Sequence, residues 1–128
     1  MYSPVERAIR QRITEGEILY TPDLTKAAPF KVKSIDEKEI ALLFGKKETP
    51  TRFSWACLEG IPAFLRGKDW VEIRMTFNTK GMPNTFDEYM KKYIKRATAN
   101  YIAVVLKKAD IVEIDRRRPL RIRLKPSL

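Results

Sequence analysis

Residues 85–125 read TFDEYMKKYIKRATANYIAVVLKKADIVEIDRRRPLRIRLK, and this stretch decides the expected fold. In its first half apolar side chains recur at helical spacing, which predicts helices over residues 85–96 and 98–109, with Ala97 alone between them. In its second half apolar and polar residues alternate, which predicts short strands over residues 111–115 and 120–125. The stretch therefore predicts two consecutive helices followed by a β-hairpin.

Positive charge is concentrated in the same half of the chain. Residues 80–128 hold 13 of the 26 Lys and Arg but 5 of the 16 Asp and Glu, so they carry +8 of the net charge of +10. Arg116–Arg118 occupy the expected hairpin turn, and Arg121, Arg123 and Lys125 form a uniformly cationic face on the last strand. A charge excess on one supersecondary unit predicts contact with a polyanion.

The second expected helix begins with short or hydrogen-bonding residues and becomes apolar only from Ile102 onward. A recognition helix needs this order, because its first side chains must approach base edges or phosphates. Asn100 could pair bidentately with adenine, and Thr98 could contact a phosphate. The pattern therefore favours nucleic acid as the polyanion.

Residues 85–125 resemble a winged helix-turn-helix DNA-binding domain. The string ATANYIAVVL at 97–106 is similar to the recognition helix of that family, and ADIVE at 109–113 is similar to its exit into the wing. The resemblance implies a second helix in the major groove and a wing on the backbone or minor groove. It implicates Thr98, Asn100, Tyr101, Arg116, Arg117, Arg118 and Arg121, and the nearby basic residues Lys95, Arg96 and Arg123 complete the candidate nucleic-acid-binding set.

The sequence of residues 1–79 predicts a small lobe that contains both helices and strands. Its expected elements are a helix over 4–15 capped by Ser3, a β-hairpin of 30–35 and 40–44, a helix over 54–66 and a strand over 70–77. Pro62 should kink or divide the second helix. Gly81 and Pro83 then mark a boundary. The expected fold is α+β, with residues 1–79 as the N-terminal lobe and 80–128 as the winged-helix-like lobe.

The composition excludes several classes of chemistry. The chain has no histidine, so imidazole catalysis and histidine-ligated metal sites are excluded. One cysteine, Cys57, cannot anchor a zinc finger, and no glycine-rich phosphate loop is present. We therefore expect neither an enzyme nor a cofactor. No membrane span or signal peptide is evident, so we expect a cytoplasmic protein that does not contact membranes.

The leading interpretation is a DNA-binding protein, either a regulator or the DNA-binding component of a larger system, that contacts double-stranded DNA. Two-fold symmetry is common among DNA regulators, so a homodimer stays open beside a monomer. The alternatives are a protein–protein adaptor in a nucleic-acid or defence complex and an RNA binder. A metal-dependent nuclease is a remote alternative, based on Asp69, Glu72 and Arg74 or on the acidic residues within 36–39.

Overall fold

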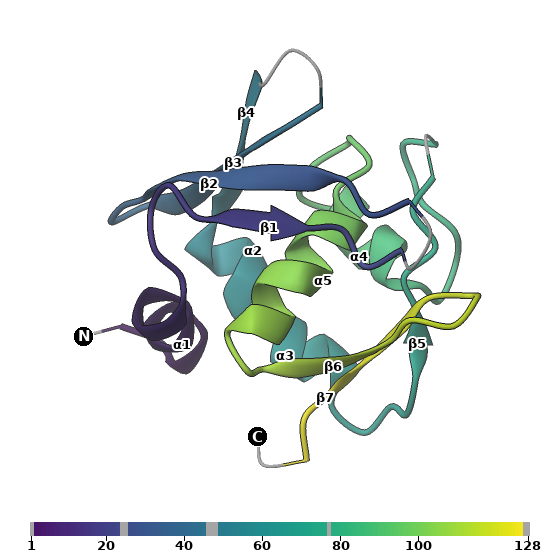
Figure 1. The fold of residues 1–128 in the computed structure, drawn as a ribbon. Coiled ribbons are helices and arrows are strands. Elements are labelled where there is room, and N and C mark those ends of the chain that lie inside the picture. The colour runs from purple at the N-terminus through teal and green to yellow at the C-terminus, as the bar shows by residue number, and fades with distance from the viewer. Residues whose placement is uncertain (1, 24–25, 46–48, 77, 127–128) are drawn as a thin grey trace.

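The structure is a computed structural model that describes residues 2–23, 26–45, 49–76 and 78–126 (Figure 1). The described chain is α+β, as expected, and contains a four-stranded and a three-stranded antiparallel sheet. No helix in these ranges is long and apolar enough to cross a membrane.

The first sheet has the order β1 (Ile18–Tyr20), β2 (Pro29–Ile35), β3 (Glu39–Phe44) and β4 (Thr49–Ser54). The hairpin expected at 30–44 is confirmed, with Ile35 opposite Ile40. Strand alternation gives this sheet one apolar face, because every second side chain points to the same side. That inner face buries Leu19, Phe30, Val32, Ile40, Leu42 and Phe53.

Two helical regions come from the first half of the chain. Helix α1 (Pro4–Arg12) is capped by Ser3, whose Oγ accepts a hydrogen bond from the backbone N–H of Glu6 at 3.2 Å. The expected helix over 54–66 is divided into α2 (Trp55–Glu59) and α3 (Ile61–Leu65). The division falls at Gly60, just before Pro62, because proline cannot donate the backbone hydrogen bond that would continue α2.

The second sheet has the order β5 (Val71–Glu72), β7 (Arg121–Leu124) and β6 (Val112–Asp115). The hairpin of β6 and β7 is confirmed, but the strand expected over 70–77 forms only at Val71–Glu72. Regular pairing ends at Glu72, and Arg74 has a φ of 47°, a left-handed conformation that interrupts an extended strand. Phe77 lies outside the described residues.

The two helices expected over 85–96 and 98–109 are present as α4 (Phe86–Lys91) and α5 (Ala99–Lys108). The first prediction was too long, because α4 ends at Lys91 and residues 92–98, rather than Ala97 alone, separate the helices. Lys91, in the last turn of α4, is only 1% exposed. Its Nζ donates to the carbonyl oxygens of Thr76 at 2.8 Å and Asn78 at 2.5 Å and pairs with Asp87 at 3.3 Å.

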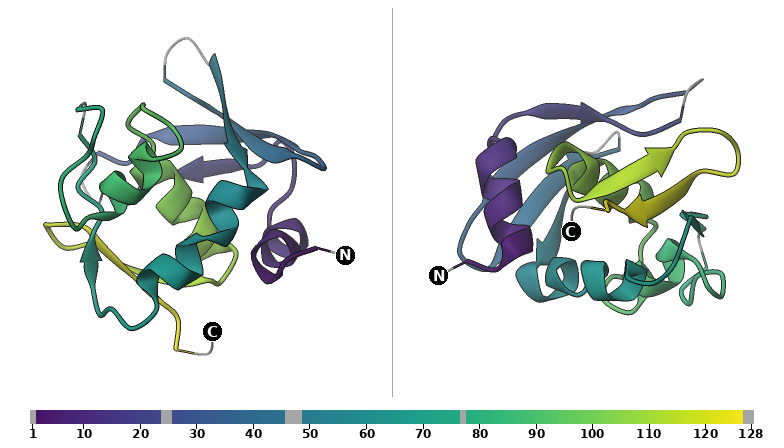
Figure 2. Two further views of the ribbon diagram at one scale, coloured as in Figure 1. Left: turned by 180° about the vertical axis from the view of Figure 1, so that it is seen from behind. Right: turned by 90° about the horizontal axis from the view of Figure 1, so that it is seen from below.

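Helix α5 lies at the centre of the molecule, between the first sheet and the β6–β7 hairpin (Figures 1 and 2). It contacts β1 and β6 as well as α1 and α4. Ile102, Val105 and Leu106 belong to one buried cluster that extends from Val5 to Ile122. The boundary at 79/80 stays a prediction, but the core itself continues across it.

Candidate nucleic-acid interface

One groove brings together candidate residues from α5 and from the β6–β7 turn. It encloses about 810 Å³ and is lined by Asp23, Arg74, Met75, Asn100, Arg116, Arg117, Arg118, Pro119 and Leu120. We call this site the arginine groove, and Arg116–Arg118 the arginine turn. Four arginines and a single carboxylate line the groove, so a positive potential is expected along it.

The arginine turn is fastened to the segment that follows β1. The Nε of Arg116 donates to the carbonyl oxygen of Pro22 at 3.1 Å, and Nη2 of Arg118 donates to Asp23 Oδ2 at 2.9 Å. The Arg118 side chain is still 76% exposed. These contacts orient the guanidinium groups without removing them from solvent, so the groups remain available to an external anion.

Asp115 lies at the base of the turn and binds two arginines. Arg117 donates to its two carboxylate oxygens at 3.0 and 3.1 Å, and Arg121 donates to Oδ2 at 2.6 Å. These charged hydrogen bonds, those from Arg117 first, hold the pKa of Asp115 well below its usual range. The carboxylate is therefore ionised at neutral pH and compensates part of the positive charge.

The outward face of β7 is not uniformly cationic, which corrects the sequence-based expectation. The antiparallel register places Glu113 opposite Arg123 and Asp115 opposite Arg121. The Nε of Arg123 donates to Glu113 at 2.8 Å, and its guanidinium carbon lies 4.3 Å from the centre of the Trp70 ring. Acids alternate with arginines across this sheet, so the strongest cationic surface lies at the turn.

The start of α5 presents Asn100 rather than its neighbours. Thr98 is fully buried, and its Oγ1 has no hydrogen-bond partner within the described part of the chain. The Tyr101 ring stacks on Phe44 at a centroid distance of 3.9 Å, and burial raises the pKa of its hydroxyl. Asn100 is partly exposed and lines the groove.

Lys95 and Arg96 are exposed in the segment between α4 and α5, and they do not line the arginine groove. Arg96 instead reaches the first sheet, where its Nη1 donates to Thr51 Oγ1 at 2.8 Å. Its guanidinium also lies over the Phe44 ring, at 5.6 Å from the ring centre. Arg96 therefore helps to join the helices to the sheet.

Arg74 belongs to the groove, although its sequence context suggested a strand or a nuclease-like cluster. The positive φ at Arg74 turns the chain out of β5 and brings this residue to the arginine turn. A positive φ at a non-glycine residue leaves no mark in hydropathy periodicity. The sequence therefore carried no signal for this position.

The acids of the nuclease alternative lie apart or in ion pairs. Asp69 lies 3.5 Å from Arg123, Glu72 lies 3.8 Å from Arg74, and Asp36 Oδ1 accepts backbone N–H bonds from Lys38 and Glu39. Among the residues that the structure describes, no three Asp, Glu, His or Cys side chains form a metal-binding group. Cys57 is buried, and desolvation raises the pKa of its thiol to about 12.

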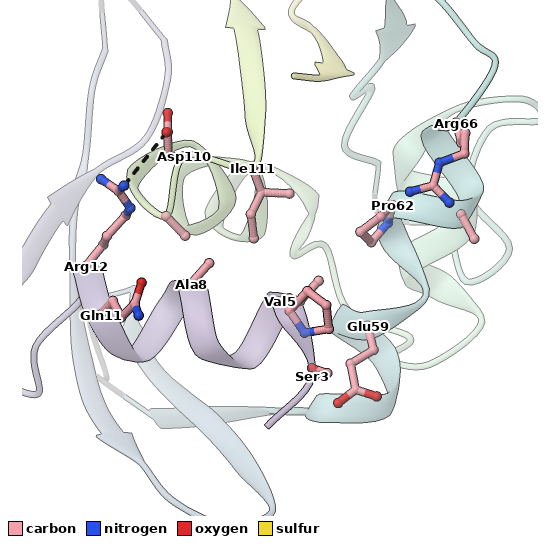
Figure 3. Close-up of a pocket in the computed structure, with 13 residues that line it drawn as sticks. Ser3, Val5, Ala8, Gln11, Arg12, Glu59, Pro62, Arg66, Asp110 and Ile111 are labelled. Carbon is pink, nitrogen blue, oxygen red and sulfur yellow. Dashed lines mark ion pairs between the residues drawn. The ribbon is translucent and has the colours of Figure 1, made fainter. Parts of the chain in front are cut away.

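A second pocket, of about 640 Å³, lies between α1, α3 and the end of α5 (Figure 3). Val5, Ala8 and Pro62 give it an apolar lining, and Arg12 and Asp110 form an ion pair of 3.9 Å at its edge. This pocket carries charges of both signs, whereas the arginine groove is predominantly positive.

The arginine groove thus combines an amide side chain from α5 with guanidinium groups from the segment after β5 and from the hairpin turn. Its lining offers several guanidinium N–H donors to an anion. Comparison with known proteins found no matching family model, no matching curated protein and no matching solved structure.

Proposed function

We propose that this protein binds DNA through the arginine groove. The observation that carries the proposal is that Asn100 and the three residues of the arginine turn line the same groove. Arginines that contact phosphates displace condensed counterions, and this release favours binding. An asparagine beside them can read a base edge through its amide.

In the winged helix-turn-helix form of this proposal, α5 is the second helix and the β6–β7 hairpin is the wing. The burial of α5 limits its accessible residues to Asn100, Tyr101, Val104, Lys107 and Lys108. The arginine turn and the first turn of α5 therefore make the contact. The protein would serve as a regulator or as the DNA-binding part of a larger system.

The acids near the groove do not prevent phosphate binding. The Arg118–Asp23 pair is exposed, and surface ion pairs of this kind contribute only about 0–1 kcal/mol. Arg116 donates to a neutral carbonyl oxygen, so its charge has no carboxylate partner within the described residues. A phosphate can compete with Asp23 for Arg118 at small cost, and at Arg116 it replaces a neutral acceptor with a stronger, charge-assisted bond.

The test removes positive charge from the arginine turn and, in a separate variant, from positions outside the groove. One variant changes Arg116, Arg117 and Arg118 to alanine. The control variant changes the exposed residues Arg7, Arg66 and Lys92 to alanine. Fluorescence anisotropy with a short labelled duplex gives affinities between about 50 and 200 mM salt. The turn variant should lose about ten-fold or more in affinity and should flatten the log–log salt slope by about 2 to 3.

The control variant loses the same formal charge but should stay within about two-fold of the wild type, because its residues lie outside the arginine groove. Equal losses in both variants would show that net charge alone drives binding and would remove the groove from the proposal. Absence of any salt dependence would contradict the electrostatic mechanism itself.

A protein–protein adaptor is the second candidate, and the pocket of Figure 3 favours it. Its lining mixes apolar side chains with charged groups of both signs, which suits a peptide or protein partner better than a polyanion. A charge placed in its lining by Ala8→Glu would disrupt docking there and leave DNA affinity unchanged. The variant of the arginine turn should lose DNA affinity and leave docking at this pocket unchanged.

A further inference from the structure

The outer face of the first sheet carries exposed aromatic and basic side chains next to the arginine groove. In β1, Leu19 points into the core, so Ile18 and Tyr20 point outward and are 57% and 58% exposed. Lys31 lies opposite Ile18 in the neighbouring strand, and Lys33 follows on the same face. The described helices lie on the opposite side of the sheet (Figures 1 and 2).

Tyr20 is held close to the arginine turn by the backbone. Two residues after it, Pro22 accepts the hydrogen bond from Arg116 at 3.1 Å, and Asp23 pairs with Arg118 at 2.9 Å. Two residues of extended chain span about 7 Å at most. The backbone at Tyr20 therefore lies close to the arginine turn, and contacts between residues far apart in the chain fix it there.

The position of α5 disfavours a duplex as the preferred partner. A helix that reads the major groove must project from its protein, because the whole helix enters this groove, which is about 12 Å wide. Here α5 is flanked by β1 on one side and β6 on the other, and Lys108 is tied to Glu17 at 3.3 Å. The exposed residues of α5 therefore lie between two strands, and these strands hinder the insertion of the helix into the groove of a rigid duplex.

We propose that the preferred ligand is a single-stranded nucleic acid. Its phosphates lie in the arginine groove, one base stacks on Tyr20, and the backbone continues past Lys31 and Lys33. This combination of a cationic groove and an aromatic platform suits single strands, because their unpaired bases expose flat faces for stacking. The inference rests on the proposed function and narrows its partner.

The experiment uses the full chain, labelled oligothymidine and a duplex of equal length at one salt concentration. The single strand should bind about ten-fold more tightly than the duplex. Tyr20→Ala should weaken single-strand binding by about ten-fold and change duplex binding little, since stacking on one ring typically contributes this much. Tyr20→Phe keeps the ring and should retain near-wild-type affinity.

Tyr93→Ala is the matched control, because Tyr93 is also half exposed, at 49%, but lies between α4 and α5 rather than on the outer face of the first sheet. It should leave single-strand affinity unchanged, and thermal unfolding of each variant verifies that the fold is intact. Tighter binding of oligouridine than of oligothymidine would also support the inference and identify RNA as the source of the strand.

Two results separate this inference from the proposed function. If the duplex binds as tightly as the single strand, or if Tyr20→Ala has no effect, the inference is overturned while DNA binding through the groove still stands. If the wild type binds neither polymer, the proposed function fails as well.

Discussion

Asp115 determines how two arginines are presented at the end of the second sheet. It accepts hydrogen bonds from Arg117 and Arg121, and its side chain is 6% exposed although that of Arg117 is 83% exposed. The carboxylate therefore acts as a fixed inner anchor for an outer guanidinium. Such an anchor lowers the conformational entropy that Arg117 loses when it binds a phosphate.

We predict that Asp115→Asn makes the stability of the protein less dependent on pH. The folded-state pKa of Asp115 is lowered, so its contribution to the free energy of unfolding is present above the ordinary value near 3.9 and declines as the pH falls below it. Urea unfolding followed by circular dichroism should show the largest difference between wild type and variant near neutral pH. A difference that stays constant into the acid range would contradict this.

At the scale of elements, one hydrogen bond and one glycine hold α4 against the α2–α3 junction. The Tyr89 hydroxyl of α4 donates to the carbonyl oxygen of Cys57 at 2.6 Å. A Cβ at Gly60 would lie 2.5 Å from that hydroxyl oxygen, which is closer than real Cβ contacts allow. Gly60 is thus required for close approach and not for its backbone angles, since its φ is −78°.

We predict that Gly60→Ala and Tyr89→Phe are non-additive. Gly60→Ala alone should destabilise the protein, whereas in the Tyr89→Phe background the next side-chain atom lies at 3.6 Å and most of the clash disappears. Tyr89→Phe alone should cost about 1–3 kcal/mol, because the buried Cys57 carbonyl loses its donor. A double-mutant cycle from urea unfolding should give a coupling of about 1 kcal/mol or more, and additive effects would refute the packing argument.

At the scale of the whole molecule, the described residues share one core. Val71 pairs with Ile122 between β5 and β7, and Arg96 reaches Thr51 across the expected boundary. The buried cluster likewise contains residues from both parts of the sequence. The basic C-terminal part therefore depends on the N-terminal part for much of its apolar packing.

We predict that the fragment 80–128 does not fold on its own. Separation would expose Ile102, Leu106 and Ile122, which are fully buried in the whole chain. The intact protein should unfold in a single cooperative transition, whereas the fragment should give a circular dichroism spectrum without a thermal transition. A cooperative transition in the fragment would establish the winged-helix-like lobe as an independent domain.

The sequence by itself determined the features that depend on near neighbours. The caps at Ser3, Ser54 and Thr85 could be read from residue types, because each side chain bonds a backbone N–H three residues ahead. Alternation identified the hairpins β2–β3 and β6–β7, since strand partners joined by a short turn are local in sequence. The concentration of arginine at the turn was likewise visible.

Tertiary contacts decided the rest. Helix α4 buries Lys91, because the carbonyl oxygens of Thr76 and Asn78, outside the helix, accept hydrogen bonds from its ammonium group. The helical period cannot tell a wet lysine from a buried one whose partners come from another segment. The arginine groove gains Arg74 through a local change of φ, and the segment after β1 is held to it by a hydrogen bond between residues 22 and 116. Such approaches depend on the packing of the whole core, which no local pattern encodes.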